Sequence, residues 1–394
     1  MDKRVIPLAL GGLGIGTTEF AIMGLLPDIA GSLQVTIPEA GILISAYALG
    51  VVVGAPLLIG FTVKQPPKKV LIWLMILFTL FNGLSIASPN YHFMFLARFL
   101  SGLPHGAFFG AGTVVASRLA VKGKEARYIS YMFSGLTVAN LAMVPLVTYI
   151  GHTFHWRWYF VIVTIIGLIT LAFIKLWLPD LPGKENADAF EELKFLKKSK
   201  PWYILLITAI GFGGLFCWFS YITPLMTNVA GIPKDQMAYI MVLAGAGMVA
   251  GNLLGGYLSD RVGESKSTVW LLIAMLMVLL GIFFFSSYTI VALILTFICA
   301  GLSLSVSAPI NMMMIKAAPG SEMMSAAFMQ AAFNVANSLG AYLGGIPLTF
   351  GLAYNYPSLV GAAMTVAGLG ICLRYIYKYG RTGAEAVEIR KEEV

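Results

Sequence analysis

The chain has 394 residues, of which 58% are hydrophobic and only 11% are charged, and its mean hydropathy is +0.84. Soluble domains carry about a quarter charged residues, so this composition excludes an ordinary soluble globular protein. The formal net charge of +8 could indicate a nucleic-acid partner. The placement of the basic residues argues instead for a topology signal, so we expect a lipid bilayer and no nucleic acid as the surroundings of this chain.

Apolar runs of about twenty residues recur along the whole chain, and each could cross about 30 Å of hydrocarbon as a helix. Helices are expected because every backbone polar group must be satisfied inside the lipid. The start, Met1 to Arg4 before an apolar run, resembles a signal peptide. The run continues to Pro27, contains Glu19 and lacks a small-residue cleavage site, so we interpret it as a retained first span. The twelve predicted spans are 5–27, 40–62, 70–88, 92–117, 127–150, 158–178, 202–227, 237–258, 268–286, 289–315, 323–349 and 357–377.

Nearly all of the 26 Lys and Arg residues fall in loops on one side of these spans. The exceptions are Arg157 and Lys234 in the opposite loops and Arg98 within a span. Basic loops stay in the cytoplasm, so we predict a multi-pass protein of the cell (inner) membrane with both termini cytoplasmic. An even number of spans is then required, and twelve satisfies this.

The longest internal polar segment divides the chain into two related parts. A shift of 197 residues aligns Pro27 with Pro224 and Gly54 with Gly251, and it also aligns Val138-Ala139-Asn140 with Val335-Ala336-Asn337. The predicted fold is therefore an all-α membrane protein with two pseudo-symmetric six-helix bundles, and such duplication is typical of transporters. The predicted parts are an N-terminal bundle (1–178), a cytoplasmic linker (179–200) with a short surface helix near 190–196, a C-terminal bundle (201–378) and a cytoplasmic tail (379–394).

Enzyme, cofactor and metal chemistry find no support in the residue pattern. The three cysteines Cys217, Cys299 and Cys372 lie in apolar runs without metal-ligand spacing. There is no P-loop and no H-E-x-x-H pair. We expect no cofactor, no metal site and no enzymatic activity.

Several motifs resemble the major facilitator superfamily over essentially the whole chain, and in particular its twelve-span drug:proton antiporter branch and the bacterial arabinose-efflux and sugar-efflux subgroup. The markers are T-E-F-A-I-M-G-L-L-P (18–27), Y-A-L-G-V-V-V-G-A-P (47–56), R-F-L-S-G-L-P-H-G-A-F-F-G (98–110), G-L-T-V-A-N-L-A-M-V-P-L (135–146), F-N-V-A-N-S-L-G-A-Y-L-G-G (333–345) and G-L-A-Y-N-Y (351–356).

The resemblance implies export of a small molecule, and it also implies a cytoplasmic gate at the loop that follows the second span of each bundle. In the second bundle this loop reads G-G-Y-L-S-D-R-V-G and supplies Gly256, Asp260 and Arg261. In the first bundle Lys64 stands where the family has an acidic residue, which puts that copy of the gate in doubt.

Glu19 is the only acidic residue deep inside a predicted span, about fourteen residues or roughly 21 Å from the cytoplasmic side. A carboxylate at such depth usually faces a cavity or a partner. Arg98 lies at a similar depth, so we hypothesise that the two residues pair or share a proton-linked network. His105 lies two helical turns after Arg98 and could take up a proton. The alternatives are a structural ion pair and a histidine buried for packing.

Amide and aromatic side chains near the predicted bundle interface could contact a substrate. For the amides the alternative is hydrogen bonding between helices, and for the aromatic residues it is core or lipid contact. The predicted substrate-binding residues are Asn140, Trp218, Tyr221, Gln330, Asn334, Asn337 and Phe109.

The predicted function is secondary active export of a small molecule, such as arabinose, another sugar or an amphipathic drug, by proton antiport. The expected partners are the substrate and protons, and the protein is expected to be a monomer. The alternative is facilitated or import-direction sugar transport without Glu19-dependent coupling. A membrane receptor or scaffold is disfavoured by the duplicated bundles and by the buried Glu19 and Arg98.

Overall fold

The computed structural model describes residues 2–62, 64–121, 124–183, 193–319 and 321–392. Within these residues every regular element is a helix. Eleven helical stretches are long and apolar enough to cross a membrane. The prediction of an all-helical membrane protein is therefore confirmed.

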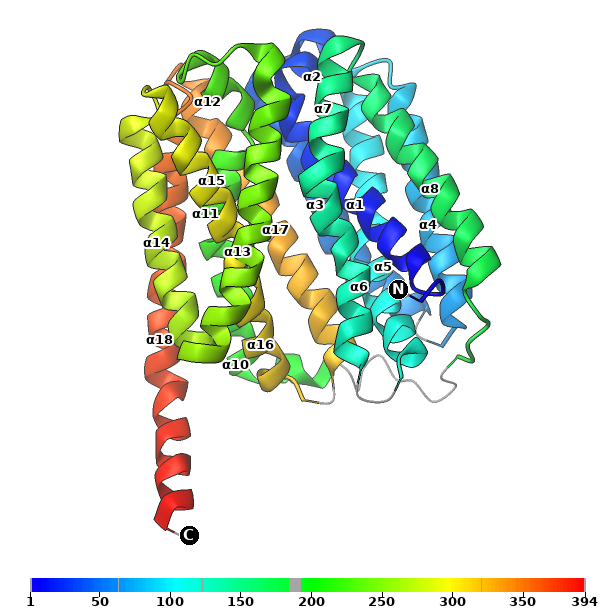
Figure 1. The fold of residues 1–394 in the computed structure, drawn as a ribbon, viewed down its shortest axis with the longest axis vertical. Helices are drawn as coiled ribbons and strands as arrows, with labels where there is room; N and C mark the ends of the chain where they lie inside the picture. Colours follow the sequence, from blue (N-terminus) through cyan, green and yellow to red (C-terminus); the bar gives the residue numbers. More distant parts are fainter. Residues whose placement is uncertain (1, 63, 122–123, 184–192, 320, 393–394) are drawn as a thin grey trace.

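The helices up to residue 177, here called the first-half helices, lie together at the right of Figure 1. They are α1 (Ile6–Gly24), α2 (Leu26–Leu33), α3 (Ile37–Thr62), α4 (Pro67–Ile86), α5 (Tyr91–Leu119), α6 (Glu125–Val138), the π-helix η1 (Ala139–Met143), α7 (Val144–Thr153) and α8 (Arg157–Trp177).

The helices from residue 193 onward, the second-half helices, lie together at the left of Figure 1. They are η2 (Leu193–Lys197), α10 (Ser199–Leu206), the π-helix η3 (Ile207–Gly211), α11 (Gly213–Phe219), α12 (Ile222–Asn228), η4 (Lys234–Gln236), α13 (Met237–Val262), α14 (Glu264–Phe285), α15 (Thr289–Ser305), α16 (Ser307–Ala317), α17 (Glu322–Thr349) and α18 (Tyr356–Glu392).

Two expectations at the ends of these elements need adjustment. Of the surface helix predicted near 190–196, the described part is the 3-10 helix η2, and residues 184–192 lie outside the described part of the chain. The last span was expected at 357–377, which agrees with the apolar stretch Tyr356–Tyr379, but the helix α18 continues beyond that span to Glu392.

α17 is long enough to span a membrane but is not among the eleven apolar stretches. Polar side chains lower its hydropathy, among them Gln330, Asn334, Asn337 and Ser338. A helix with so many amides is poorly suited to face lipid on all sides. Its amides are instead almost fully buried at 334 and 337, which indicates that α17 lies against other helices.

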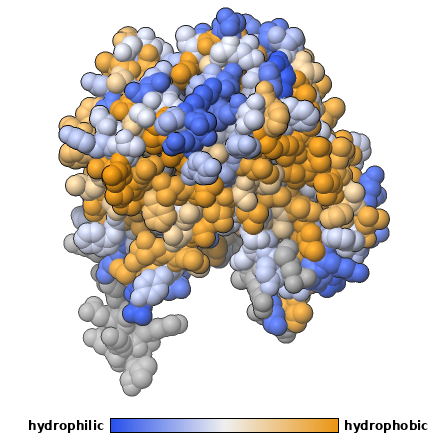
Figure 2. Space-filling view, turned by 45° about the horizontal axis from the view of Figure 1, so that its top comes forward, coloured by the Kyte–Doolittle hydropathy of each residue, from blue (hydrophilic) through white to orange (hydrophobic). Residues whose placement is uncertain are grey.

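The outer surface of the helices is apolar. Phe61, Leu253 and Ile290 are each more than 70% exposed, and Figure 2 shows a hydrophobic band below a hydrophilic cap. Exposed apolar area of this extent is not typical of soluble monomers. The surface therefore fits contact with lipid acyl chains.

Small residues allow neighbouring helices to touch along their backbones. A Cβ added at Gly54 of α3 would lie 2.1 Å from the Leu103 carbonyl oxygen of α5. A Cβ at Gly251 of α13 would lie 1.8 Å from the Gly301 carbonyl oxygen of α15. Close backbone approach of this kind is how helices associate in lipid.

First-half and second-half helices meet along two seams, with α3 against α17 and with α7 and η1 against α13. We call the end of the molecule with α2 and α12 the α2 end, and the end with residues 179–183 and η2 the linker end (Figure 1). Ser45 Oγ donates to the Ser338 carbonyl oxygen at 2.9 Å, and Thr223 Oγ1 donates to the Met23 and Gly24 carbonyl oxygens at 3.0 and 3.1 Å. In the described residues, the polar contacts between these two sets of helices lie from mid-height to the α2 end.

The backbone contact at Gly54 can be tested within a single helix. Gly54→Ala should destabilise the protein by about 1–3 kcal/mol because the new methyl group overlaps α5. Gly60 lies in the same helix, and a Cβ there would meet nothing within 4 Å, so Gly60→Ala is the control. Thermal unfolding in detergent should show a lower melting temperature for Gly54→Ala only, and equal melting temperatures would contradict this packing.

Candidate functional site

Glu19 lies on α1 at the boundary with the second-half helices and is only 7% exposed. Its Oε1 accepts a long hydrogen bond from Asn337 Nδ2 of α17 at 3.5 Å. Asn337 is fully buried, and its Oδ1 has no hydrogen-bond partner in the described residues. One amide therefore approaches the carboxylate from across the seam and retains an unused acceptor.

Arg98 of α5 is fully buried, but it binds Thr18 rather than Glu19. Its Nη1 donates to the Thr18 carbonyl oxygen and to Thr18 Oγ1, both at 3.1 Å. Its guanidinium group lies 4.3 Å from the centre of the Tyr47 ring, a distance typical of cation–π contacts. No Glu19–Arg98 ion pair within 4.0 Å occurs among the described residues. The direct pair hypothesised from the sequence is thus not formed.

Thr18 organises the polar side chains around Arg98. Its Oγ1 donates to Asn82 Oδ1 at 2.7 Å, and Asn82 Nδ2 donates to the Phe78 carbonyl oxygen at 2.8 Å. Tyr159 OH donates to the Thr18 carbonyl oxygen. Helices α1, α4, α5 and α8 thereby meet at one residue. Buried polar groups cost free energy unless they are paired in this way.

His105 joins the same network through Tyr47. The Tyr47 hydroxyl lies 3.1 Å from His105 Nδ1, and the His105 ring packs edge-on against Phe109 with centroids 5.4 Å apart. Tyr47 therefore contacts Arg98 through its ring and His105 through its hydroxyl. We call Thr18, Tyr47, Asn82, Arg98, His105 and Tyr159 the first-half polar network.

Four members of this network were not predicted from the sequence: Thr18, Tyr47, Asn82 and Tyr159. Their signal is weak because single hydroxyl and amide groups are common in membrane helices. Thr18 is next to Glu19, and Asn82 is an amide within an otherwise apolar run. Those two positions could have been identified as partners for a buried charge.

Two of the predicted substrate-binding amides bond to backbone carbonyl groups one turn earlier in the chain. Asn140 Nδ2 donates to the Leu136 carbonyl oxygen, and Asn334 Nδ2 donates to the Gln330 carbonyl oxygen, each at 3.0 Å. The Oδ1 of Asn334 has no partner in the described part of the chain. An amide side chain can both donate and accept hydrogen bonds, so Asn334 keeps its Oδ1 as an acceptor for another group.

The predicted aromatic residues are packed rather than exposed. Phe109 stacks on Phe133 with centroids 5.0 Å apart. Trp218 is 1% exposed, and its Nε1 has no partner in the described residues. Tyr221 OH donates to the Ala341 carbonyl oxygen at 2.7 Å. In this conformation Tyr221 therefore joins the break between α11 and α12 to α17.

Comparison with known proteins bears on what such an arrangement does. The sequence profile of the Major Facilitator Superfamily matches residues 8–345. The chain belongs to this family. It is accordingly a multi-pass membrane transporter of small molecules and not an enzyme.

Relatives over nearly the full length carry transporter names. The "Putative transporter AraJ" of Escherichia coli (strain K12) is 38% identical over 375 residues, which is 95% of each chain. The "Probable sugar efflux transporter" of Pasteurella multocida (strain Pm70) is 30% identical over 96% of this chain and 93% of the relative. The "Chloramphenicol resistance protein" of Streptomyces lividans is 28% identical over 84% of this chain and 86% of the relative.

At the linker end, the residues predicted as a gate lie near the end of α13. Asp260 and Arg261 are exposed, Arg261 lies 5.1 Å from the centre of the Tyr257 ring, and a Cβ at Gly256 would meet open space. In this transporter they make no polar contact with first-half helices in the described residues. The gate role remains a prediction.

The first-half copy of that loop departs from the family pattern and has other contacts. Lys68 Nζ lies 3.2 Å from Asp180 Oδ1, and Arg118 Nη1 donates to the Pro182 carbonyl oxygen at 2.6 Å. Both partners belong to the start of the predicted linker. Lys68 of α4 and Arg118 of α5 therefore hold the start of the linker against the first-half helices.

A second charged cluster, not predicted from the sequence, lies at the α2 end. Lys234 Nζ lies 2.5 Å from Asp28 Oδ1, and His152 Nδ1 lies 2.8 Å from Asp28 Oδ2. Partial burial raises the pKa of the Asp28 carboxyl, but its contacts with His152 and Lys234 outweigh this and hold the pKa below its usual value. The Asp28 carboxylate is therefore charged at neutral pH.

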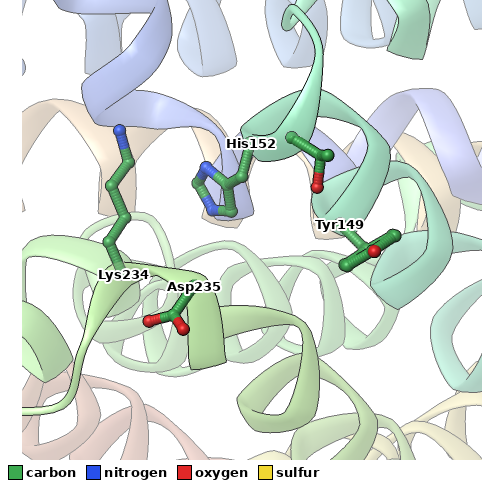
Figure 3. Close-up of a pocket in the computed structure, with 5 residues that line it drawn as sticks. Tyr149, His152, Lys234 and Asp235 are labelled. Atoms are coloured by element: carbon green, nitrogen blue, oxygen red, sulfur yellow. The ribbon is translucent and has the colours of Figure 1, made fainter.

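A cavity of about 440 Å³ adjoins this cluster. Its lining, drawn in Figure 3, comes from α7 on one side and from η4 on the other: Tyr149, His152, Thr153, Lys234 and Asp235. The cavity thus lies between a first-half and a second-half segment.

The geometry around Arg98 leads to a prediction about stability. Arg98→Lys keeps the charge but cannot donate to both Thr18 oxygens while covering the Tyr47 ring. We expect a loss of roughly 1–3 kcal/mol, since buried acceptors lose their donor. The loss of stability is measured by thermal unfolding, with Arg374→Lys on the exposed face of α18 as the control. The network would be unimportant for stability if the two variants unfolded at the same temperature.

Proposed function

We propose that this transporter exports a small molecule, either a sugar such as arabinose or an amphipathic drug or metabolite, in exchange for protons. The observation that carries the proposal is the Glu19 carboxylate, buried at the seam between first-half and second-half helices with Asn337 of the opposite side as its hydrogen-bond partner. A titratable group in that position can link its protonation to the movement of the two sets of helices.

The proposed architecture has twelve spans in two six-helix bundles, residues 1–178 and 201–378. It counts the eleven apolar stretches and adds α17 as the twelfth. Helix breaks support the duplication, because α1 breaks at Leu25 and the seventh span breaks at Ser220–Tyr221, positions that the 197-residue shift brings within one residue. The concentration of basic residues at the linker end supports a cytoplasmic location for that end and for both termini.

With this orientation, the α2 end faces away from the cytoplasm. The cross-seam polar contacts lie from mid-height to that end, and the surface is notched between the two sets of helices at the lower edge of Figure 2. We infer an inward-facing state of an alternating-access cycle. Export would then require the seams to open at the α2 end and close at the linker end.

Proton coupling follows from the cost of charge at Glu19. A charged carboxylate in the middle of a membrane costs about 2.5–3.5 kcal/mol on insertion scales, and one long amide contact offsets only part of this. Arg98 makes no ion pair with Glu19: its Nη1 donates to Thr18 and its guanidinium group covers the Tyr47 ring, whereas its Nε and Nη2 have no hydrogen-bond partner in the described residues. Glu19 is proposed to exchange the proton, and Arg98 and His105 are proposed to assist through the first-half polar network.

The substrate is proposed to bind between the bundles near Glu19. Amides with unused acceptors suit hydroxyl groups, and aromatic side chains suit a sugar ring or an apolar drug. The name of one relative, a sugar efflux transporter, agrees with a sugar substrate and with export, and the name of another, a chloramphenicol resistance protein, agrees with a drug substrate. The proposed substrate-contacting residues are Phe109, Asn140, Trp218, Tyr221, Gln330, Asn334 and Asn337.

Substrate and direction can be tested together in cells. Cells with and without the protein are loaded with radiolabelled arabinose, other sugars and chloramphenicol, and the amount retained is followed over time. Faster loss of at least one compound from expressing cells is expected. If every compound in a broad panel is retained equally in both strains, export of these two classes is wrong.

Coupling can be tested with Glu19→Gln in everted membrane vesicles that hold an imposed proton gradient. A proton crossing 100 mV supplies about 2.3 kcal/mol, which sustains a substrate gradient of roughly 50-fold. We expect wild-type vesicles to accumulate an identified substrate and Glu19→Gln vesicles only to equilibrate it. Exposed Glu39→Gln is the matched control. Accumulation unchanged in Glu19→Gln would remove Glu19 from the proton path and favour uncoupled transport.

A further inference from the structure

The ion pair between Asp28 and Lys234 joins the two sets of helices at the α2 end. Asp28 belongs to α2, whereas Lys234 begins η4, 206 residues later in the chain. The pair is partly exposed to solvent, since the side chains of Asp28 and Lys234 are 17% and 50% exposed. Among the described residues it is the ion pair that connects a first-half helix to a second-half helix.

The surroundings of Asp28 and Lys234 allow the pair to separate at low cost. Asp28 keeps His152 at 2.8 Å on its own side of the seam when Lys234 departs. Lys234 is half exposed, and Asp235 stands beside it at the same cavity. Removing one partner from a fully buried pair leaves an uncompensated charge, but this pair is partly exposed, so water can solvate both charges when they separate.

The cavity beside the pair provides the space for that separation. It lies between Tyr149 and His152 of α7 and Lys234 and Asp235 of η4 (Figure 3). The Lys234 side chain can therefore move off Asp28 without displacing a packed side chain.

A second contact closes the same end just below the pair. Thr223 Oγ1 of α12 donates to the carbonyl oxygens of Met23 and Gly24. These are the last residues of α1, where carbonyl groups lack partners within the helix. A second-half residue thus caps a first-half helix as long as this end is closed.

We propose that Asp28, His152 and Lys234 form a reversible latch that holds the α2 end of the transporter closed. Asp28 and Lys234 make the bond that breaks, and His152 holds the Asp28 carboxylate when it is broken. The latch would set how often the substrate path opens at this end. This inference rests on the proposed alternating-access cycle, but it does not require protons to be the coupled ion.

The latch can be tested by measuring distances across the α2 end in lipid nanodiscs without substrate or proton gradient. Spin labels at Phe154→Cys and Tyr288→Cys, both exposed positions on opposite sides of the seam, report the separation by pulsed electron resonance. The native cysteines are buried and are replaced by serine in all samples. Lys234→Met should raise the ratio of long to short distances by roughly two- to fivefold, the range expected for a partly exposed ion pair.

Lys316→Met is the matched control because Lys316 forms a 3.0 Å pair with Glu264 inside the second half. High salt provides a test without mutation, because salt screens partly exposed pairs. Raising salt should increase the long-distance fraction of the parent protein and leave Lys234→Met unchanged. The latch is refuted by an unchanged ratio in Lys234→Met, by an equal change in Lys316→Met or by no salt effect. Because no transport is measured, loss of the Glu19 coupling proposal would not alter this result.

Discussion

The membrane interior offers no water to an exposed charge, and this constraint explains the arrangement around Arg98. A fully buried guanidinium group must find its partners within the protein. Arg98 Nη1 binds a backbone carbonyl and a hydroxyl and the group covers an aromatic ring, whereas Nε and Nη2 have no hydrogen-bond partner in the described residues. Four first-half helices are fixed to one another as a result. The rigidity of that side of the transporter depends on this network.

Close packing and movement make opposite demands on the seams between the two sets of helices. Within each set, glycines bring backbones into direct contact, as at Gly54 and Gly251. Between the sets, the described polar contacts are few and end at mid-height. The seams are nevertheless closely packed, because α3 lies along α17 and a Cβ at Gly245 of α13 would lie 2.4 Å from the Asn140 carbonyl oxygen of η1. Movement of the two sets relative to one another must therefore separate these apolar and backbone contacts as well as the few polar ones.

How much the sequence predicts depends on the range of the interaction. The spans follow from apolar runs of sufficient length, and buried Glu19 and Arg98 stand out because charge is rare there. The partners of Arg98 do not follow, because Tyr47 and Tyr159 are distant in sequence and resemble many other membrane tyrosines. Asp28 and Lys234 look like ordinary loop charges, and only the packing of α2 beside η4 brings them together. The span that corresponds to α17 was predicted, like the others, from an apolar run, although its amides keep it below the hydropathy of the eleven apolar stretches.

Thr18 and Glu19 are consecutive residues of α1, but Thr18 contacts first-half helices and Glu19 contacts a second-half helix. Neighbouring residues of a helix point about 100° apart, so Thr18 faces Arg98 and Asn82 whereas Glu19 faces Asn337. The first-half network fixes the rotation of α1, and that rotation presents the carboxylate to α17. In the proposed cycle, opening of the seam would move Asn337 away with its own helix while Glu19 stayed with α1. A change in the separation of the two sets of helices would then become a change in the environment of a single carboxylate.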